Sequence, residues 1–309
     1  MSILFYCNWP NADEWLTLLR QAMPEETIES WPGVTNIDAV EIALVWATPT
    51  GFLSKIPNLS LILSLGAGVD HIMADKDIPR DVPIARVVDP IMADRMAEYI
   101  AGQVLRHHLQ LDRYRDQAGV KTWQRHFPRD AGKTTTTVLG LGSLGQRAAE
   151  YLSCLGFRSC GWSRNPKTIP GVDCYAGEGG LGEVLAKSQH LICLLPLTDD
   201  TFGILNKSLF DQLPEGAQII NCARGHHLQD DALFAALDSG QLSEAVLDVF
   251  VTEPLPQDHR FWTHPNIVVT PHISSLSEPT SSAQILAQQV ADHRAGKIPE
   301  NQISLDTGY

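Results

Sequence analysis

Short apolar runs alternate with helical patterns along almost the whole chain, and this alternation predicts parallel β-sheets covered by helices. In the first third of the chain, the predicted strands are residues 3–6, 43–46, 59–65 and 82–86. Residues 12–22, between the first two of these strands, carry apolar side chains at the spacing of an amphipathic helix. This part of the chain therefore predicts an α/β domain with its own core.

A second series of strands begins after a long helical pattern over residues 94–118. That pattern is longer than the average helix of a globular domain, so we expect it to bridge two domains. Further along, Asp230 is expected to cap a helix over residues 231–238, which Gly240 ends. The other predicted elements are a helix over residues 144–155 and strands over 134–139, 157–162, 191–195, 217–221, 245–249 and 267–270.

The last amphipathic pattern, over residues 279–294, lies beyond the final strand of the second series and is not needed there. We therefore expect this helix to return to the N-terminal domain, which would be discontinuous. The predicted domains are residues 1–98 with 276–309, and residues 99–275 inserted between them. Both are expected to be doubly wound parallel sheets, the first of them flavodoxin-like.

The composition indicates which kinds of partner are disfavoured and in which compartment the protein is expected. A formal net charge of −13 argues against nucleic acid or an anionic membrane surface as a partner, although local cations can still bind a small anion. The chain has no apolar run long enough to span a bilayer and no basic leader at its start. Six cysteines without CxxC spacing indicate reduced thiols, so we expect a cytoplasmic protein.

A glycine pattern lies between the strand at 134–139 and the helix that follows it. Gly140 permits a tight turn, Gly142 lets the backbone approach a pyrophosphate, and Gly145 lets helix and strand pack closely. The backbone N–H groups of Ser143 and Leu144 at the helix start are expected to face the phosphates. The predicted fold class is therefore α/β, with a Rossmann cofactor domain inserted in the flavodoxin-like domain.

The next strand bears on the choice between NADP(H) and NAD(H). An NAD site usually ends this strand with an acid that accepts from the ribose 2′-hydroxyl, yet no acid occurs before Asp173. Arg164 can instead bind a 2′-phosphate, with Ser163 donating a further hydrogen bond and Lys167 nearby. We therefore expect NADP(H) to be preferred, with NAD(H) remaining possible.

Residues after two later strands are also expected to contact the cofactor, because open α/β sheets bind ligands at the carboxyl ends of their strands. Leu195 and Pro196 follow one such strand, with Thr201 a hydrogen-bonding neighbour. Cys222 and Ala223 follow the next strand.

Three ionisable residues follow strands of the same predicted sheet: Arg224, Glu253 and His272. Each alone would be an ordinary surface side chain, but the carboxyl ends of parallel strands can bring all three to one crevice. His226 and His227 lie beside Arg224, without an evident partner. No cluster of His, Cys or carboxylate residues has the spacing of metal ligands, so we expect no metal.

Taken in order, these motifs resemble the D-isomer-specific 2-hydroxyacid dehydrogenase family, and within it the members that reduce glyoxylate and hydroxypyruvate. The likeness runs over essentially the whole chain and implies a two-domain enzyme with a cleft, usually a homodimer, that reduces small 2-oxo acids. The flavodoxin-like domain would then be the substrate domain. The blocks that carry the likeness are residues 44–46, 65–70, 162–164, 235–240, 247–250 and 307–309.

The resemblance also implies roles for single residues. His272 would donate a proton to the substrate carbonyl oxygen, and Glu253 would orient its ring and favour its charged form. Arg224 would bind the substrate carboxylate and polarise the carbonyl. Asp248 would lie near the nicotinamide carboxamide.

Further substrate contacts are expected in the N-terminal domain. The backbone N–H groups of Ala67 and Gly68, in a glycine-rich turn, are candidates for a second carboxylate clamp. Trp46 ends a strand beside that turn, where burial in the core and a place in the pocket wall are equally compatible with the sequence.

Two other functions fit parts of the pattern. One is an NAD-dependent 2-hydroxyacid dehydrogenase acting on another substrate, which the missing acid and Arg164 disfavour. The other is a non-enzymatic, co-repressor-like dinucleotide sensor. A sensor needs the glycine turn but has no need for Arg224, Glu253 and His272, so the enzyme is favoured.

Overall fold

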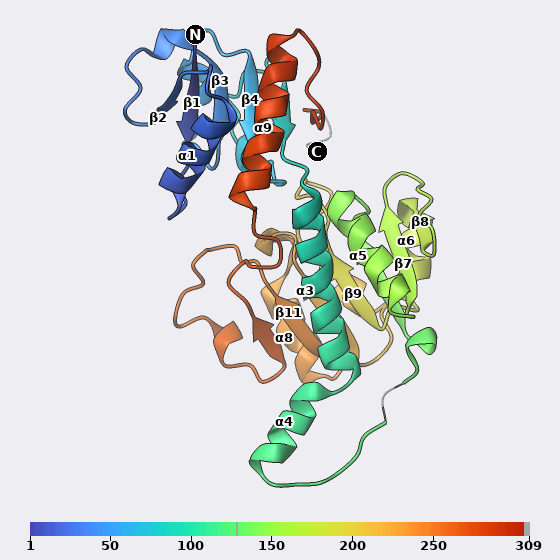
Figure 1. Cartoon of the computed structure of the whole chain (residues 1–309). Coiled ribbons are helices and arrows are strands. Elements are labelled where there is room, and N and C mark those ends of the chain that lie inside the picture. Colours follow the sequence, from blue (N-terminus) through green and yellow to red (C-terminus); the bar gives the residue numbers. More distant parts are fainter. Residues whose placement is uncertain (128, 306–309) are drawn as a thin grey trace. The chain divides into compact units, whose positions relative to one another are not determined.

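The computed structural model describes residues 1–127 and 129–305, so the motif at residues 307–309 lies outside the described part. The chain forms two compact units, Met1–Met92 with Ser277–Tyr309, and Ala93–Leu276 (Figure 1). The first division falls after residue 92 and not after residue 98, because Met96 and Ala97 pack into the core of the second unit.

The first unit is built on a five-stranded parallel sheet in the order β2-β1-β3-β4-β5, which is the flavodoxin-like order. Helices α1 (Ala12–Ala22) and α9 (Pro279–Arg294) lie side by side in this unit, although they come from opposite ends of the chain (Figure 1). The strands are β1 (Ser2–Tyr6), β2 (Ile28–Ser30), β3 (Val40–Val45), β4 (Leu61–Ser64) and β5 (Ile84–Arg86).

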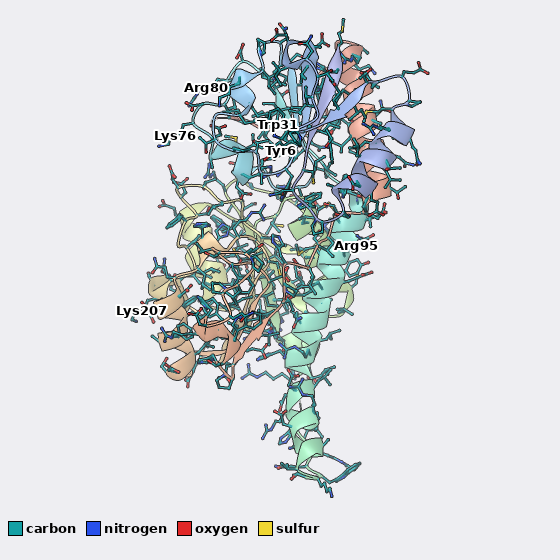
Figure 2. All side chains as sticks on the ribbon, turned by 90° about the vertical axis from the view of Figure 1, so that its left-hand side faces the viewer. Tyr6, Trp31, Lys76, Arg80, Arg95 and Lys207 are labelled. Atoms are coloured by element: carbon teal, nitrogen blue, oxygen red, sulfur yellow. The ribbon has the colours of Figure 1, made fainter. Side chains whose placement is uncertain are left out.

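Aromatic side chains gather in this unit beside the end of β1. The rings of Tyr6 and Trp31, both labelled in Figure 2, lie 5.2 and 4.9 Å from the ring of Phe52. Strand β2, which leads to Trp31, has only three residues, so it carries too little alternation to be found from the sequence.

The second unit contains a seven-stranded parallel sheet in the order β12-β11-β10-β9-β6-β7-β8. Its first six strands in chain order follow the Rossmann arrangement, and β12 extends one edge. The predicted fold class is thus confirmed. The strands are β6 (Thr135–Leu139), β7 (Arg158–Ser163), β8 (Asp173–Ala176), β9 (His190–Cys193), β10 (Ala217–Asn221), β11 (Leu242–Leu247) and β12 (Ile267–Val269).

Two apolar clusters lie in this second unit and include side chains from its strands and helices. Helix α6 was not predicted, since its sequence holds four glycines and little apolar periodicity. The longer helices are α3 (Pro90–His108), α4 (Leu111–Gly119), α5 (Ser143–Cys154), α6 (Gly177–Leu185) and α8 (Asp230–Asp238), and α7 (Lys207–Phe210) is short. The first unit also contains the short helix α2 (Asp70–Met73).

The single helix predicted over residues 94–118 is wrong. The chain breaks between α3 and α4 at Gln110, whose φ is 55° and therefore left-handed. Val104 still packs in the core, whereas α4 has no buried residue and extends beyond the end of the sheet (Figure 1). Because α4 has no buried residue, packing in the core does not require it to continue the line of α3. Arg106 bonds to both Asp112 and Glu244, which ties the start of α4 to the sheet.

The predicted cap of α8 is also wrong. Asp230 is the first residue of the helix, and the preceding residue, Gln229, makes no side-chain capping bond. Asp230 instead faces His259, 3.6 Å from its Nε2, so a tertiary contact takes the place of a local one. The predicted stop is confirmed, because Gly240 has a φ of 78° and donates its N–H to the Leu237 carbonyl.

Candidate active site

The glycine turn joins β6 to α5 and has the form that a pyrophosphate requires. A Cβ on Gly140, whose φ is 96°, would lie 2.5 Å from the Leu194 oxygen, and one on Gly145 would lie 1.8 Å from the Gly140 oxygen. A Cβ on Gly142 would meet nothing within 4 Å, so that position faces open space. The first N–H groups of α5, on Ser143 and Leu144, have no partner inside the helix by geometry. These residues fit the phosphates of a dinucleotide.

Two cations lie near this turn. The Nζ of Lys167 donates to the Leu141 carbonyl at 2.5 Å, which holds this side chain against the glycine loop. Arg164, at the end of β7, places its Nη2 2.8 Å from the Oδ2 of Asp200. Ser163 donates its hydroxyl to the Asn165 carbonyl at 2.7 Å.

The partner of Arg164 was not found from the sequence. Asp200 comes from the segment after β9, so its proximity depends on tertiary structure alone. Both side chains are substantially exposed, at 45% for Arg164 and 79% for Asp200, so solvent weakens their attraction. A phosphate could therefore replace this carboxylate at low cost.

The segment after β9 is shaped by its own hydrogen bonds. Thr201 is 7% exposed, and its hydroxyl donates to the Pro196 carbonyl at 2.6 Å. The hydroxyl oxygen of Thr201 also accepts the N–H of Thr198 at 2.9 Å. The Thr201 side chain thus closes this loop, and its expected contact with the cofactor stays a prediction. Leu195 is buried as well.

Glu253 and His272 lie together, as the sequence predicted. Oε2 of Glu253 is 2.8 Å from Nδ1 of His272, and both side chains are partly exposed. The second oxygen, Oε1, accepts the N–H of Phe250 at 2.9 Å. This second bond fixes the direction of the carboxylate, and the carboxylate in turn fixes the imidazole.

The electrostatics of the pair favour an ionised carboxylate. Burial by itself would raise the pKa of Glu253, but the hydrogen bonds from His272 and Phe250, with the charges of His272 and Arg224, lower that pKa overall. Arg224 therefore acts on the same carboxylate as His272. The three predicted ionisable residues form one electrostatic group.

Arg224 is positioned by a neighbour to which the sequence assigned no role. It precedes the short turn Gly225–His227 and donates its N–H to Nδ1 of His227 at 3.2 Å. His227 is fully buried; its Nδ1 also lies 3.2 Å from the Arg224 carbonyl oxygen, and its Nε2 lies 3.3 Å from the Pro196 carbonyl oxygen. This imidazole links the Arg224 turn to the segment after β9.

Asp248 has a different environment from the one expected. It is fully buried, and its carboxylate accepts hydrogen bonds from the Thr270 hydroxyl at 2.5 Å, the Ile273 N–H at 2.9 Å and the Ser274 N–H at 2.8 Å. These bonds hold the loop after β12, and the expected contact of Asp248 with the nicotinamide stays a prediction.

The two residues after β10 are largely shielded from solvent. Burial raises the pKa of the Cys222 thiol well above its usual range, and the nearby charge of Asp248 acts in the same direction. Cys222 and Ala223 are each 5% exposed. The thiol therefore stays neutral, and any cofactor contact at these residues would use the backbone.

In the first unit, Trp46 follows β3 and is half-buried. Its ring lies 4.4 Å from that of His71 and 4.9 Å from that of Trp9. A Cβ on Gly66 would lie 2.7 Å from Cζ3 of Trp46, so the indole packs directly on the glycine-rich turn. The ring therefore packs in this cluster while part of it remains exposed, and its place in the substrate pocket stays a prediction.

Two side-chain hydrogen bonds stabilise the glycine-rich turn of this unit. Ser64 donates its hydroxyl to the Gly68 carbonyl at 2.8 Å, and Nη1 of Arg86 donates to the Ala67 carbonyl at 3.3 Å. Burial lowers the pKa of Arg86. Within the described residues, no hydrogen bond uses the N–H groups of Ala67 and Gly68, which leaves them available to an anion.

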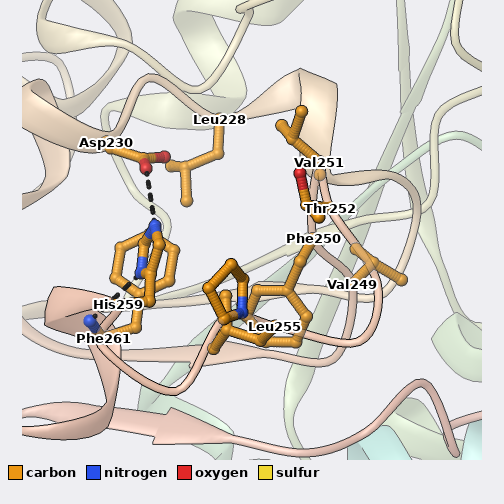
Figure 3. A pocket seen from close by; sticks show the side chains of 11 residues that line it. Leu228, Asp230, Val249, Phe250, Val251, Thr252, Leu255, His259 and Phe261 are labelled. Atoms are coloured by element: carbon orange, nitrogen blue, oxygen red, sulfur yellow. Dashed lines mark hydrogen bonds and ion pairs between the residues drawn. The ribbon is translucent and has the colours of Figure 1, made fainter.

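A small pocket is lined by residues close in sequence to Glu253, among them Phe250 and Thr252 (Figure 3). Its walls are mostly apolar, and its one ion pair joins Asp230 to His259. One wall is Gly225, beside Arg224.

Across the described residues, no group of three or more His, Cys or acidic residues is arranged to hold a metal ion. None of the described helices is both long and apolar enough for a bilayer.

Comparisons with known proteins define the class. Residues 101–274 match the model of the "D-isomer specific 2-hydroxyacid dehydrogenase, NAD binding domain" family. The chain is also 40% identical over 315 aligned residues to glyoxylate/hydroxypyruvate reductase A of Serratia proteamaculans (strain 568), with both chains covered completely. The corresponding protein of Yersinia enterocolitica is 38% identical over 314 residues, again with complete coverage. This chain therefore belongs to the D-isomer specific 2-hydroxyacid dehydrogenase family.

Solved structures agree with this assignment. A D-isomer specific 2-hydroxyacid dehydrogenase from Xanthobacter autotrophicus Py2, in complex with NADPH and MES, superposes with a TM-score of 0.95 at 38% identity, covering 100% of this chain and 99% of the other. An NADPH-dependent glyoxylate/hydroxypyruvate reductase from Sinorhizobium meliloti, in complex with NADP and sulfate, has a TM-score of 0.93 at 34% identity with complete coverage of both. The predicted family resemblance is confirmed.

Proposed function

We propose that this protein uses NADPH to reduce small 2-oxo acids, with glyoxylate and hydroxypyruvate as the first substrates to test. The observation that carries the proposal is the 2.8 Å pair of Glu253 and His272, with Arg224 acting on the same carboxylate. All three follow strands of the sheet that also carries the glycine turn. The relatives named for this reaction are similar over their whole length.

In this proposal each ionisable residue has one task. NADPH supplies a hydride to C2 of the substrate, so negative charge develops on the carbonyl oxygen. Nδ1 of His272 is held by Glu253, which leaves Nε2–H of the charged imidazole to donate a proton to that oxygen. Arg224 binds the substrate carboxylate and polarises the carbonyl. The N–H groups of Ala67 and Gly68 are proposed as further carboxylate donors.

The preference for NADPH rests on the residues at the end of β7. Arg164 and Lys167 supply positive charge there, and the strand ends without an acid. We propose that a 2′-phosphate replaces Asp200 on Arg164, with Ser163 as a further donor. Leu195, Pro196 and Ala223 are proposed to contact the cofactor through their backbone.

A panel of 2-oxo acids assayed with NADPH and NADH, followed at the absorbance of the reduced nicotinamide, tests this function. We expect turnover with NADPH, and a loss of about 10²–10⁴-fold in kcat for His272→Gln with NADPH binding retained. Equal or better turnover with NADH would favour the NAD-dependent alternative. Cofactor binding without turnover of any oxo acid would favour the dinucleotide sensor.

We also propose a cytoplasmic homodimer. The six cysteines are free thiols, which suits a reducing compartment. Helix α4 has no buried residue, and the segment after it exposes Val120 at 74%, Trp123 at 92% and Phe127 at 88%. Such an apolar surface is typical of an interface between copies of a chain. Sedimentation equilibrium should give twice the chain mass for the wild type, and a lower mass for Trp123→Ser.

A further inference from the structure

The loop that carries His272 has a backbone conformation that needs support. His272 has a φ of 53°, in the left-handed region that side chains other than glycine rarely adopt. Its ring is 45% exposed, so packing around the ring does little to hold it. Conformations of this kind persist where the surrounding structure over-determines them. Something other than the ring's burial must therefore fix this loop.

The support comes from hydrogen bonds made by Asp248, Thr270 and Tyr99. Asp248 accepts the N–H groups of Ile273 and Ser274, directly after His272. It also accepts the hydroxyl of Thr270, two residues before His272, at 2.5 Å. The oxygen of Thr270 lies 2.6 Å from the hydroxyl of Tyr99, on α3. The loop is thus held on both sides of His272 by one carboxylate.

The chemistry of these groups decides which one donates in each hydrogen bond of this series. An ionised carboxylate can only accept, so Thr270 must donate its one hydroxyl proton to Asp248. Tyr99 must then be the donor to Thr270. Burial raises the pKa of Tyr99, and the charge of nearby Asp248 acts in the same direction, so the phenol keeps the proton it donates. The hydroxyl protons of Tyr99 and Thr270 thus each have one acceptor.

We propose that Tyr99, Thr270 and Asp248 form a hydroxyl relay that positions His272 for proton transfer. None of the three touches the reacting atoms in this proposal, so they are positioning residues. Glu253 orients the imidazole through Nδ1, and the relay fixes the backbone that presents it. The effect on turnover rests on the proposed reductase function, whereas the effect on the His272 ring does not.

The experiment removes single hydroxyl groups and keeps side-chain shape. Thr270→Val and Tyr99→Phe break the relay, and Thr270→Ser restores a hydroxyl in place of the lost one. Thr137→Val is the matched control, since Thr137 is a buried threonine of the same unit whose hydroxyl lies 2.5 Å from that of Ser188. Each variant is assayed for kcat, KM and melting temperature. The ¹⁵N signals of the His272 imidazole, assigned by their loss in His272→Gln, are recorded on the full-length protein.

We expect Thr270→Val to lower kcat by about 10- to 100-fold while KM for NADPH stays within about twofold of wild type. Tyr99→Phe should give a smaller loss in the same direction, and Thr270→Ser should recover most of kcat. The His272 imidazole signals should shift or broaden in both relay variants. Thr137→Val should lower the melting temperature and leave kcat and these signals unchanged.

The relay is overturned if Thr270→Val keeps wild-type kcat and an unchanged His272 signal. It is also overturned if Thr137→Val reduces kcat as much as Thr270→Val does, because a general loss of stability would then explain both. A wild-type protein that reduces no oxo acid, but whose His272 signal responds to Thr270→Val and not to Thr137→Val, would retain the relay and refute the reductase function. The two proposals therefore fail separately.

Discussion

Gly225 lies directly against the backbone of Phe250, so closely that a Cβ on Gly225 would be 2.1 Å from the Phe250 carbonyl carbon. Gly225 follows Arg224, and Phe250 donates its N–H to Glu253. The absence of one side chain thus lets the Arg224 turn approach the loop that carries Glu253. Distances in the site depend on this contact.

Gly225→Ala should therefore reduce activity through geometry. We expect overpacking to cost about 1–3 kcal/mol of unfolding free energy, with a loss of kcat/KM on the order of 100-fold. Gly102→Ala is the matched control, because Gly102 lies within α3 and nothing lies within 4 Å of the added Cβ. The control should be as active as wild type and slightly more stable. Full activity in Gly225→Ala would show that the contact is not needed.

The lowered pKa of Glu253 predicts a pH dependence. A carboxylate with a lowered pKa contributes its stabilisation above its unfolded-state pKa and loses it as the pH falls through the folded value. The Glu253–His272 pair should therefore persist in wild type from neutral pH down to below the pH at which an ordinary glutamate is protonated. Glu253→Gln should lower kcat/KM on the order of 100-fold throughout this range, because the ring loses its orientation. Profiles of kcat/KM against pH for both proteins measure this, and coinciding profiles would remove Glu253 from the mechanism.

Cofactor selectivity should depend on Arg164. Loss of a charge-assisted contact of about 1.5–3 kcal/mol predicts that Arg164→Ala raises KM for NADPH by roughly 10- to 100-fold. KM for NADH should not change, since NADH lacks the 2′-phosphate. Lys207→Ala, which removes an exposed cation paired with Asp211, is the control for net charge. Equal effects of Arg164→Ala on both cofactors would contradict the assignment.

Asp200→Asn tests the exchange of partners on Arg164. Exposed ion pairs are worth about 0.2–1 kcal/mol, so removing the competing carboxylate should lower KM for NADPH by a small factor, up to about fivefold. Initial rates at low NADPH concentration are the sensitive measurement. An increase in KM would mean that Asp200 supports the cofactor and does not compete with it.

Burial of His190 predicts that the protein loses stability in mild acid. Burial lowers the pKa of His190 to about 4, despite the hydrogen bond with Gln218 that raises it. Between the unfolded-state value of about 6.5 and this folded value, the unfolded chain binds more protons, so stability falls as pH falls. The contribution approaches roughly 1.4 kcal/mol per pH unit. Urea unfolding of wild type and His190→Gln from pH 7 to 4 should show a shallower slope for the variant, and parallel slopes would exclude His190 as a source.

The parts of the molecule that the sequence revealed are those encoded by local spacing. Gly140, Gly142 and Gly145 stand between a strand and a helix, and Arg224 and His272 lie shortly after strands, so order along the chain made them candidates, while their roles came from the family resemblance. The fold class followed from the same alternation. The break at Gln110 could not be predicted, because it results from the lack of packing partners beyond α3 and carries no Gly or Pro signal.

Contacts between distant residues were missed for a different reason. Asp200 meets Arg164 only because segments after β7 and β9 lie close together in the fold. The sequence gives His227 no evident partner, and only tertiary packing shows it buried between Arg224 and Pro196. Tyr99 lies on a helix far in sequence from Thr270, so no motif joins the two.

The ion pair between Arg164 and Asp200 has a consequence for competing solutes. A free phosphate or sulfate ion that bound Arg164 would have to displace an internal carboxylate, which would reduce its gain at the guanidinium. In the proposed site, a dinucleotide would have its pyrophosphate anchored at the glycine turn, which would give its 2′-phosphate a high effective concentration beside Arg164. The internal counter-ion would then favour a tethered phosphate over free anions.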